Sequence, residues 1–272
     1  MLVYPNAKIN IGLNVVEKRP DGYHNIETVF YPIGLCDALE VEVSESCTDY
    51  SFSSSGILLE GDPEHNLIVQ AFRLLRSQFQ FPPLDISLYK QIPFGAGLGG
   101  GSSDASFMLK VLNEMFELKL TPGKLQKLAA QLGADCPVFI KNKPVFASGI
   151  GDVFKPIKFS LKGYFLLLVK PDIHVATPEA YSLVVPKQPE FSLADLIQRP
   201  IQEWKGQVVN DFETSVFSKY PKIKNLKDEM YEMGALYASM SGSGSSVYGL
   251  FESTPEVDNT FDDCFITGGV LK

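Results

Sequence analysis

A glycine-rich stretch at residues 93–106 is the part of the sequence best suited to hold an anion. Its glycines are Gly95, Gly97, Gly99, Gly100 and Gly101. Because glycine has no Cβ atom, the backbone amides of such a loop can approach one ligand closely. Ser102 and Ser103 follow where an apolar helical pattern begins, and the dipole of a helix favours a negative charge at that end. This combination predicts that the loop binds phosphate.

Glycine-rich loops of other kinds also bind nucleotides, and the sequence distinguishes this stretch from most of them. Residues 95–100 match the G-x-G-x-x-G pattern of dinucleotide-binding proteins. That fold needs a strand after the helix that follows the loop, whereas a second helix is expected here, so a dinucleotide-binding protein is kept as an alternative only. The stretch has no Lys-Ser or Lys-Thr pair, which excludes a Walker A loop, and the H-R-D and D-F-G motifs of protein kinases are absent from the chain. A glycine-rich hinge without a ligand stays open.

The elements around the loop are predicted from hydrophobic periodicity. Alternation over residues 84–89 indicates a strand that leads to the loop, and apolar residues at helical spacing over residues 105–116 indicate a helix after it, with Ser102, Ser103 and Asp104 as candidate caps. The next helix is expected from Thr121 to Gly133. Further strands are predicted at residues 39–43, 164–169 and 264–267, further helices from residues 62, 177, 192 and 221, and polar loops at residues 45–55 and 239–246.

Residues 7–16 alternate between apolar and polar side chains, which predicts a half-buried strand. Lys8 and Asn10 are two residues apart, so both should point to the same side, away from the core. A turn is expected directly before Tyr23 and His24, and a second strand after them.

The composition excludes several kinds of protein. Lys and Arg number 24 against 32 Asp and Glu, so the net charge is −8 and a nucleic-acid partner is disfavoured. No apolar run reaches the roughly 18 residues that suggest a membrane span, and no secretory signal is visible, so no membrane partner is expected. The four cysteines form no C-x-x-C pair, and we interpret them as reduced thiols of a cytoplasmic protein.

Three motifs along the chain resemble those of the GHMP kinases, the family of galactose, homoserine, mevalonate and phosphomevalonate kinases. They are Pro5-x-Ala7-Lys8-Ile9-Asn10, the glycine loop from Pro93 to Ser103, and the small-residue stretch at residues 239–244. Within the family, Asp21-Gly22-Tyr23-His24 and Gly133-Ala134-Asp135 resemble the branch that phosphorylates a methylerythritol carrying a cytidine diphosphate group.

The resemblance implies an α+β fold of two lobes, residues 1–155 and 156–272, with the active site in the cleft between them. It implies transfer of the γ-phosphate of ATP to the 2-hydroxyl of the cytidyl substrate. The alternative within the family is a kinase for another small-molecule alcohol.

The resemblance also implies roles for single residues. Asp135 is expected to be the general base and Lys8 its partner, since a lysine keeps a nearby carboxylate ionised; a structural ion pair is the alternative. The residues expected to contact the substrate are Asn10, Tyr23, His24, Thr177 and Tyr181, with the tyrosines stacking on the cytosine and His24 bonding its edge. The residues expected to contact ATP are Asn66, Pro93, Gly95, Gly97, Leu98, Gly99, Gly100, Gly101, Ser102 and Ser103. Mg²⁺ is expected with the ATP, and Ser103 is its candidate ligand.

Two residues depart from the family pattern. Asp104 stands where the family usually has Asn, and it is expected to add a negative charge close to the phosphates. Tyr181 replaces a usual Phe, which keeps an aromatic face for stacking.

Overall fold

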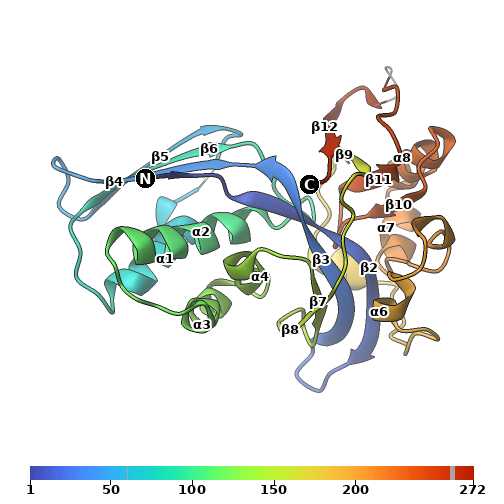
Figure 1. Ribbon diagram of the computed structural model, residues 1–272, viewed down its shortest axis with the longest axis horizontal. Coiled ribbons are helices and arrows are strands. Elements are labelled where there is room, and N and C mark those ends of the chain that lie inside the picture. Colours follow the sequence, from blue (N-terminus) through green and yellow to red (C-terminus); the bar gives the residue numbers. More distant parts are fainter. Residues whose placement is uncertain (60, 258–260) are drawn as a thin grey trace. The chain divides into compact units, whose positions relative to one another are not determined.

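The structure, a computed structural model, describes residues 1–59, 61–257 and 261–272. The described residues form an α+β fold with three four-stranded sheets (Figure 1). They divide into two compact units whose segments alternate along the chain. Unit 1 consists of Met1–Ala7, Leu35–Phe94 and Gly99–Lys143, and unit 2 of Lys8–Gly34, Gly95–Leu98 and Pro144–Lys272.

Unit 1 is one sheet with helices packed against it. The strand order is β1 (Leu2–Val3), β4 (Ala38–Val43), β6 (Leu84–Lys90) and β5 (Tyr50–Gly56), and only the β5–β6 pair is parallel. Its helices are η1 (Pro63–His65), α1 (Leu67–Arg76), α2 (Gly100–Met115), α3 (Pro122–Leu132) and α4 (Cys136–Lys141). The apolar residues of β4 and β6 form one core with those of the α helices. The predicted strand at residues 84–89 and the two helices after the glycine loop are therefore confirmed.

Unit 2 contains two sheets. One has the order β2 (Asn6–Lys18), β3 (His24–Cys36), β7 (Val145–Ser148) and β8 (Val153–Pro156), and the other the order β10 (Tyr237–Met240), β11 (Val247–Phe251), β9 (Phe165–Pro171) and β12 (Cys264–Val270). Its helices are α5 (Thr177–Tyr181), α6 (Leu193–Leu196), η2 (Ile201–Glu203), α7 (Glu213–Lys219) and α8 (Pro221–Glu232). Apolar residues of α7 and α8 share a core with those of β9, β10 and β11.

The two units do not coincide with the expected lobes at residues 1–155 and 156–272. The long strands β2 and β3 lie for most of their length in unit 2, although they come first in the sequence. The glycine loop is also divided, since residues 95–98 belong to unit 2 and the residues from Gly99 onward to unit 1. A division by sequence order cannot describe units whose segments interleave in this way.

Some predicted elements were wrong. The polar loop expected at residues 45–55 contains strand β5, whose serines are mostly exposed and whose Tyr50 and Phe52 alone pack against the core. The helix expected from residue 177 is present as α5, in which Thr177 is the first helical residue and Ala176 is the N-cap. Strands β7 and β8 have four residues each, too few to show a pattern in the sequence.

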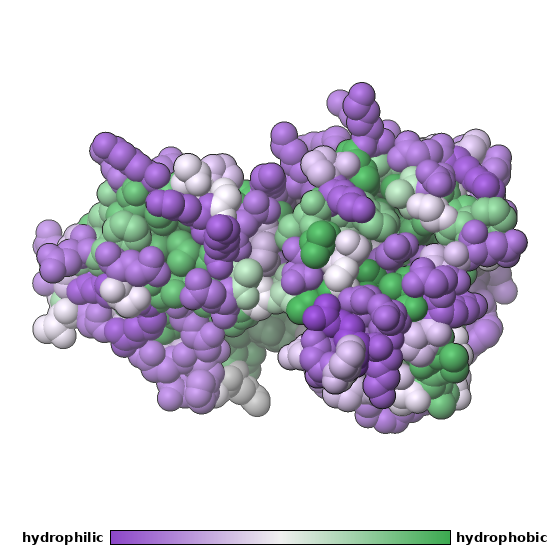
Figure 2. All heavy atoms as spheres, turned by 90° about the horizontal axis from the view of Figure 1, so that it is seen from below, coloured by the Kyte–Doolittle hydropathy of each residue, from purple (hydrophilic) through white to green (hydrophobic). Residues whose placement is uncertain are grey.

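None of the helices in the described residues combines the length and the apolar character that a membrane crossing requires. Figure 2 shows hydrophilic side chains over most of the face that it draws, with apolar residues interspersed among them.

Candidate active site

Lys8 lies on β2 with its side chain inside unit 2. Only 3% of its surface is exposed, and its Nζ donates to Asn10 Oδ1 at 2.7 Å and to the Gly97 carbonyl at 3.0 Å. Asn10 Nδ2 in turn donates to Thr28 Oγ1 at 3.0 Å. Lys8 and Asn10 therefore share one side of the strand, as predicted. The half-buried character was wrong, since every residue from Asn6 to Val15 is buried.

The third motif contacts the glycine loop within unit 2. Ser241 Oγ donates to the Gly97 carbonyl at 2.9 Å and accepts the backbone N–H of Asn10 at 3.2 Å. Gly97 has a φ of +73°, and a Cβ atom at this position would lie 1.9 Å from the Ser241 carbonyl oxygen. Only glycine allows these two loops to pack so closely. Residues from all three motifs thus meet at one carbonyl group.

The unit 1 part of the glycine loop forms the beginning of α2. Gly99, with a φ of +70°, is the N-cap, and the helix starts at Gly100. Ser102, Ser103 and Asp104 therefore lie inside the helix. The prediction that they cap it was wrong. The first amides of a helix have no carbonyl partner within it, so this end is a suitable anion site without any side-chain contribution.

Asp104 does not place a free charge at this end of the helix. It is 2% exposed, and its Oδ2 accepts from the buried Lys90 Nζ at 3.0 Å. Lys90 is also paired with Asp37, which accepts the backbone N–H groups of Gln91 and Ile92. Burial raises the pKa of Asp104 to about 8. The prediction that Asp104 adds a negative charge close to the phosphates was therefore wrong, since its carboxyl group is buried beside a lysine.

Asp135 is the N-cap residue of the short helix α4, but its side chain makes no capping hydrogen bond. Asp135 itself is partly exposed, whereas the helix residues 136–140 that follow it are buried. Asp135 belongs to unit 1 and Lys8 to unit 2. The predicted ion pair between their side chains remains a prediction.

The structure brings two of the residues expected at the cytosine together. The His24 and Tyr181 rings stack with centroids 4.6 Å apart and planes at 21°, and Tyr181 packs edge-on against Phe212 at 4.6 Å. Burial, with a smaller effect of Lys18, lowers the pKa of His24 below its ordinary value. Tyr23 is 63% exposed, so its ring offers a free surface for stacking. Thr177 is exposed at the start of α5.

Asn66 caps α1, because its Oδ1 accepts the N–H of Ile68 at 2.8 Å. It also lines a cavity of about 290 Å³ within unit 1, together with Phe52, Leu59, Pro63 and His65. The cavity combines apolar and polar groups, as ligand pockets do.

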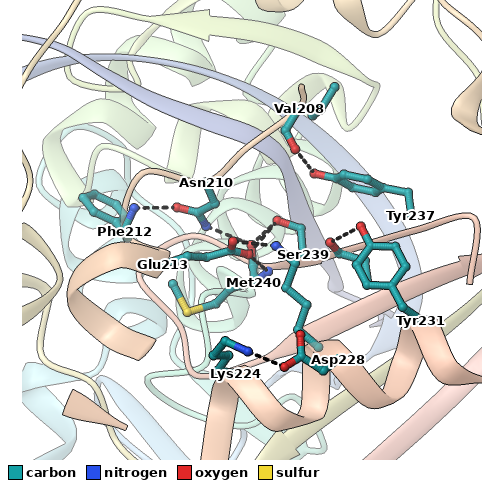
Figure 3. A network of polar contacts seen from close by, with 12 residues as sticks. Val208, Asn210, Phe212, Glu213, Lys224, Asp228, Tyr231, Tyr237, Ser239 and Met240 are labelled. Carbon is teal, nitrogen blue, oxygen red and sulfur yellow. Dashed lines mark hydrogen bonds and ion pairs between the residues drawn. The ribbon is translucent and has the colours of Figure 1, made fainter. Parts of the chain in front are cut away.

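Sequence reasoning missed Lys90 and Asn210. Asn210 is 3% exposed and belongs to a polar network that includes residues of the third motif (Figure 3). Its only signal in the sequence is an Asn-Asp pair set between the apolar Val208-Val209 and Phe212.

The chain is similar in sequence to known kinases over nearly its full length. Residues 66–143 match the family model of the GHMP kinases N terminal domain, and residues 193–264 that of the GHMP kinases C terminal domain. The chain is 57% identical over 271 residues to 4-diphosphocytidyl-2-C-methyl-D-erythritol kinase of Bacteroides fragilis, covering 98% of this chain and 99% of that protein. It is 55% identical over 274 residues to the protein of the same name from Parabacteroides distasonis, covering 100% of both.

Solved structures agree with these relatives. The crystal structure of a 4-(cytidine 5'-diphospho)-2C-methyl-D-erythritol kinase matches with a TM-score of 0.79 at 33% identity, over 92% of this chain and 90% of that chain. A homoserine kinase from Cytophaga hutchinsonii shares the fold, with a TM-score of 0.63 at 17% identity over 98% and 94% of the two chains.

Proposed function

Because this chain belongs to the GHMP kinases, we propose that it transfers the γ-phosphate of ATP to the 2-hydroxyl of 4-diphosphocytidyl-2-C-methyl-D-erythritol. The product is the 2-phosphate, in the non-mevalonate route to isoprenoid precursors. The observation that carries the proposal is the meeting of Lys8 and Ser241 at the Gly97 carbonyl, which joins the three motifs of the family in one place. The near full-length similarity to kinases named for this substrate supports its identity. The dinucleotide-binding alternative is ruled out by the family.

Two features of unit 1 support ATP binding. The beginning of α2 offers backbone amides to the phosphates, and the cavity beside Asn66 offers apolar surface to the base. We place the triphosphate on the glycine loop, from Pro93 to Ser103, and the adenine near Asn66.

Magnesium would be held mainly by the phosphate oxygens and water, as is usual for this ion. The described residues contain no group of three or more His, Cys, Asp and Glu side chains that could hold a metal. Ser103 Oγ is buried and has no hydrogen-bond partner among the described residues, so it is a hydroxyl that the chain itself leaves unsatisfied. This fits a contact with phosphate or with the ion. When bound, Mg²⁺ would neutralise charge on the β- and γ-phosphates.

The protein's own residues divide the remaining work. We assign Asp135 as the general base that accepts the proton of the 2-hydroxyl, and Lys8 as the cation that steadies the developing alkoxide. Asn10 holds Lys8 by its Oδ1 and is itself held by Thr28, which supports a role in orienting the lysine beside any contact with the substrate. Tyr23, His24 and Tyr181 would bind the cytosine, and Thr177 the nearby nucleotide half.

The test is ADP release from ATP with a panel of alcohols. The panel contains the cytidyl methylerythritol, the same alcohol without its cytidine diphosphate group, galactose, homoserine and mevalonate. We expect turnover with the cytidyl compound alone. Turnover with another member, and none with the cytidyl compound, would instead support a different substrate within the family.

A further inference from the structure

Residues 210–213, with the sequence Asn-Asp-Phe-Glu, lie outside the three motifs of the family. Each of these residues contacts a different part of unit 2. Asp211 Oδ2 accepts the N–H of Val15 on β2 at 2.7 Å, and Glu213 accepts the N–H of Met240 at 2.9 Å while pairing with Lys227 at 2.6 Å. The segment is therefore fixed to both sheets of unit 2. A side chain on it is held in a defined place.

The Asn210 carboxamide holds the third motif on both sides of Ser241. Its Nδ2 donates to the carbonyl of Met240 at 2.8 Å and to the carbonyl of Gly242 at 2.8 Å. The bond to Met240 is drawn in Figure 3. Ser241, between them, is the residue whose hydroxyl binds the Gly97 carbonyl. The position of that hydroxyl thus depends on a side chain from outside its own loop.

The other end of the same carboxamide binds the backbone of Phe212, whose side chain belongs to the aromatic cluster. Asn210 Oδ1 accepts the backbone N–H of Phe212 at 3.1 Å, as Figure 3 shows. The Phe212 ring packs edge-on against Tyr181, which stacks on His24. The side chain uses two N–H donors and one acceptor in the described structure, and it is 3% exposed. Leaving any of these groups unpaired in the interior is costly, so the three contacts are expected to hold together.

We propose that Asn210 is a positioning residue for both parts of the reaction: through Ser241 it sets the Gly97 carbonyl that orients Lys8, and through Phe212 it sets the rings that bind the cytosine. The inference rests on the proposed function, because the rings matter only if the substrate carries a base. The inference adds one residue, Asn210, whose side chain affects both the phosphoryl transfer and the binding of the cytosine.

The two ends of Asn210 can be tested separately. Asn210→Asp keeps the acceptor for Phe212 but places a carboxylate oxygen against two carbonyls, so we expect kcat to fall at least tenfold with a smaller change in KM for the cytidyl substrate. Ser241→Ala removes the hydrogen bond from Ser241 Oγ to the Gly97 carbonyl and should cause a similar fall in kcat. Phe212→Leu keeps the backbone N–H but removes the ring edge, so we expect KM for the cytidyl substrate to rise severalfold with kcat and KM for ATP preserved.

Tyr31→Phe is the matched control. It removes one buried hydrogen bond of unit 2, in which Tyr31 Oη accepts the N–H of Leu161 at 3.1 Å, and both residues lie outside the three motifs and the aromatic cluster of His24, Tyr181 and Phe212. We expect its kcat and both KM values to equal those of the wild type. Thermal unfolding and calorimetric binding of cytidine diphosphate are measured for every variant, so that a loss of folded protein is recognised.

The inference is overturned if folded Asn210→Asp and Ser241→Ala proteins turn over like the wild type, or if Phe212→Leu changes kcat and KM for ATP as much as KM for the cytidyl substrate. If Asn210→Asp does not fold, Ser241→Ala and Phe212→Leu decide the question alone. Failure of the proposed function looks different, since the wild type itself would then release no ADP with the cytidyl substrate.

Discussion

Replacing Lys90 by methionine should destabilise the protein by about 3 to 5 kcal/mol, the usual cost of removing one partner from a buried ion pair. Lys90 Nζ lies between Asp37 and Asp104, and the side chains of all three residues are at most 3% exposed. Methionine has a similar length but no charge, so both acids would be left buried without their cation. The loss should be nearer the lower value, because Asp37 keeps its bonds from the Gln91 and Ile92 amides.

The assay is urea unfolding followed by circular dichroism. Lys224→Met serves as the control, because Lys224 pairs with Asp228 on the surface of α8, with side chains 54% and 51% exposed. Such pairs contribute about 1 kcal/mol or less. Asp104→Asn is a second comparison: because burial raises the pKa of Asp104 to about 8, this carboxyl group is mostly neutral at pH 7, and the amide is neutral too and keeps an oxygen for Lys90, so the stability should stay within about 1 kcal/mol of the wild type. A Lys90→Met protein no less stable than Lys224→Met would refute the reasoning.

Three further predictions concern the reaction. Asp135→Ala should abolish ADP release while calorimetry still detects ATP binding; near-normal turnover would remove Asp135 as the base. Tyr23→Ala should raise KM for the cytidyl substrate roughly tenfold, since stacking on one base contributes about 1 to 3 kcal/mol, and leave KM for ATP unchanged; an equal rise in both would indicate misfolding. Because burial lowers the pKa of His24 below 6.5, the folded ring is neutral at pH 7, so KM for the cytidyl substrate should be constant from pH 7 to 8.5. In the unfolded chain His24 binds a proton at a higher pH than in the folded protein, so its contribution to the free energy of unfolding is lost as the pH falls below 6.5. A His24 pKa above 6.5, measured by NMR on the folded protein, would contradict this.

The elements with a clear apolar pattern could be predicted from the sequence. The helix α3 and the strand β6 each bury one face, and the apolar side chains mark that face in the sequence. The helix α2 shows an apolar pattern of the same kind, although it is buried on most sides. The pattern failed at β2, where polar residues alternate with apolar ones but both sides of the strand are buried. Lys8 and Asn10 can be buried because their partners are Gly97 and Thr28, which lie 89 and 18 residues away from them in the sequence. Periodicity contains no information about such partners.

The candidate site residues were predicted from the resemblance alone, which could not point to residues outside its motifs. Lys90 and Asn210 are single polar residues in otherwise ordinary segments, and what distinguishes them is burial against specific acids and carbonyls. A carbonyl partner leaves no trace in the sequence, because every residue has one. Asp104 was expected to carry a free charge because its partner could not be recognised in the sequence. That partner, Lys90, precedes the glycine loop and belongs to no motif.

The role of the glycines also becomes more specific than phosphate binding. Gly97 has to lack a side chain because Ser241 of the third motif packs against it, and its carbonyl then accepts from both Ser241 and Lys8. A substitution at Gly97 would therefore displace the third motif and the lysine together, before any effect on bound phosphate. Since Asn210 holds the third motif from the other side, the position of Lys8 depends on contacts spread over more than 200 residues of the chain. We therefore propose that the loop positions Lys8 through the Gly97 carbonyl as well as binding phosphate.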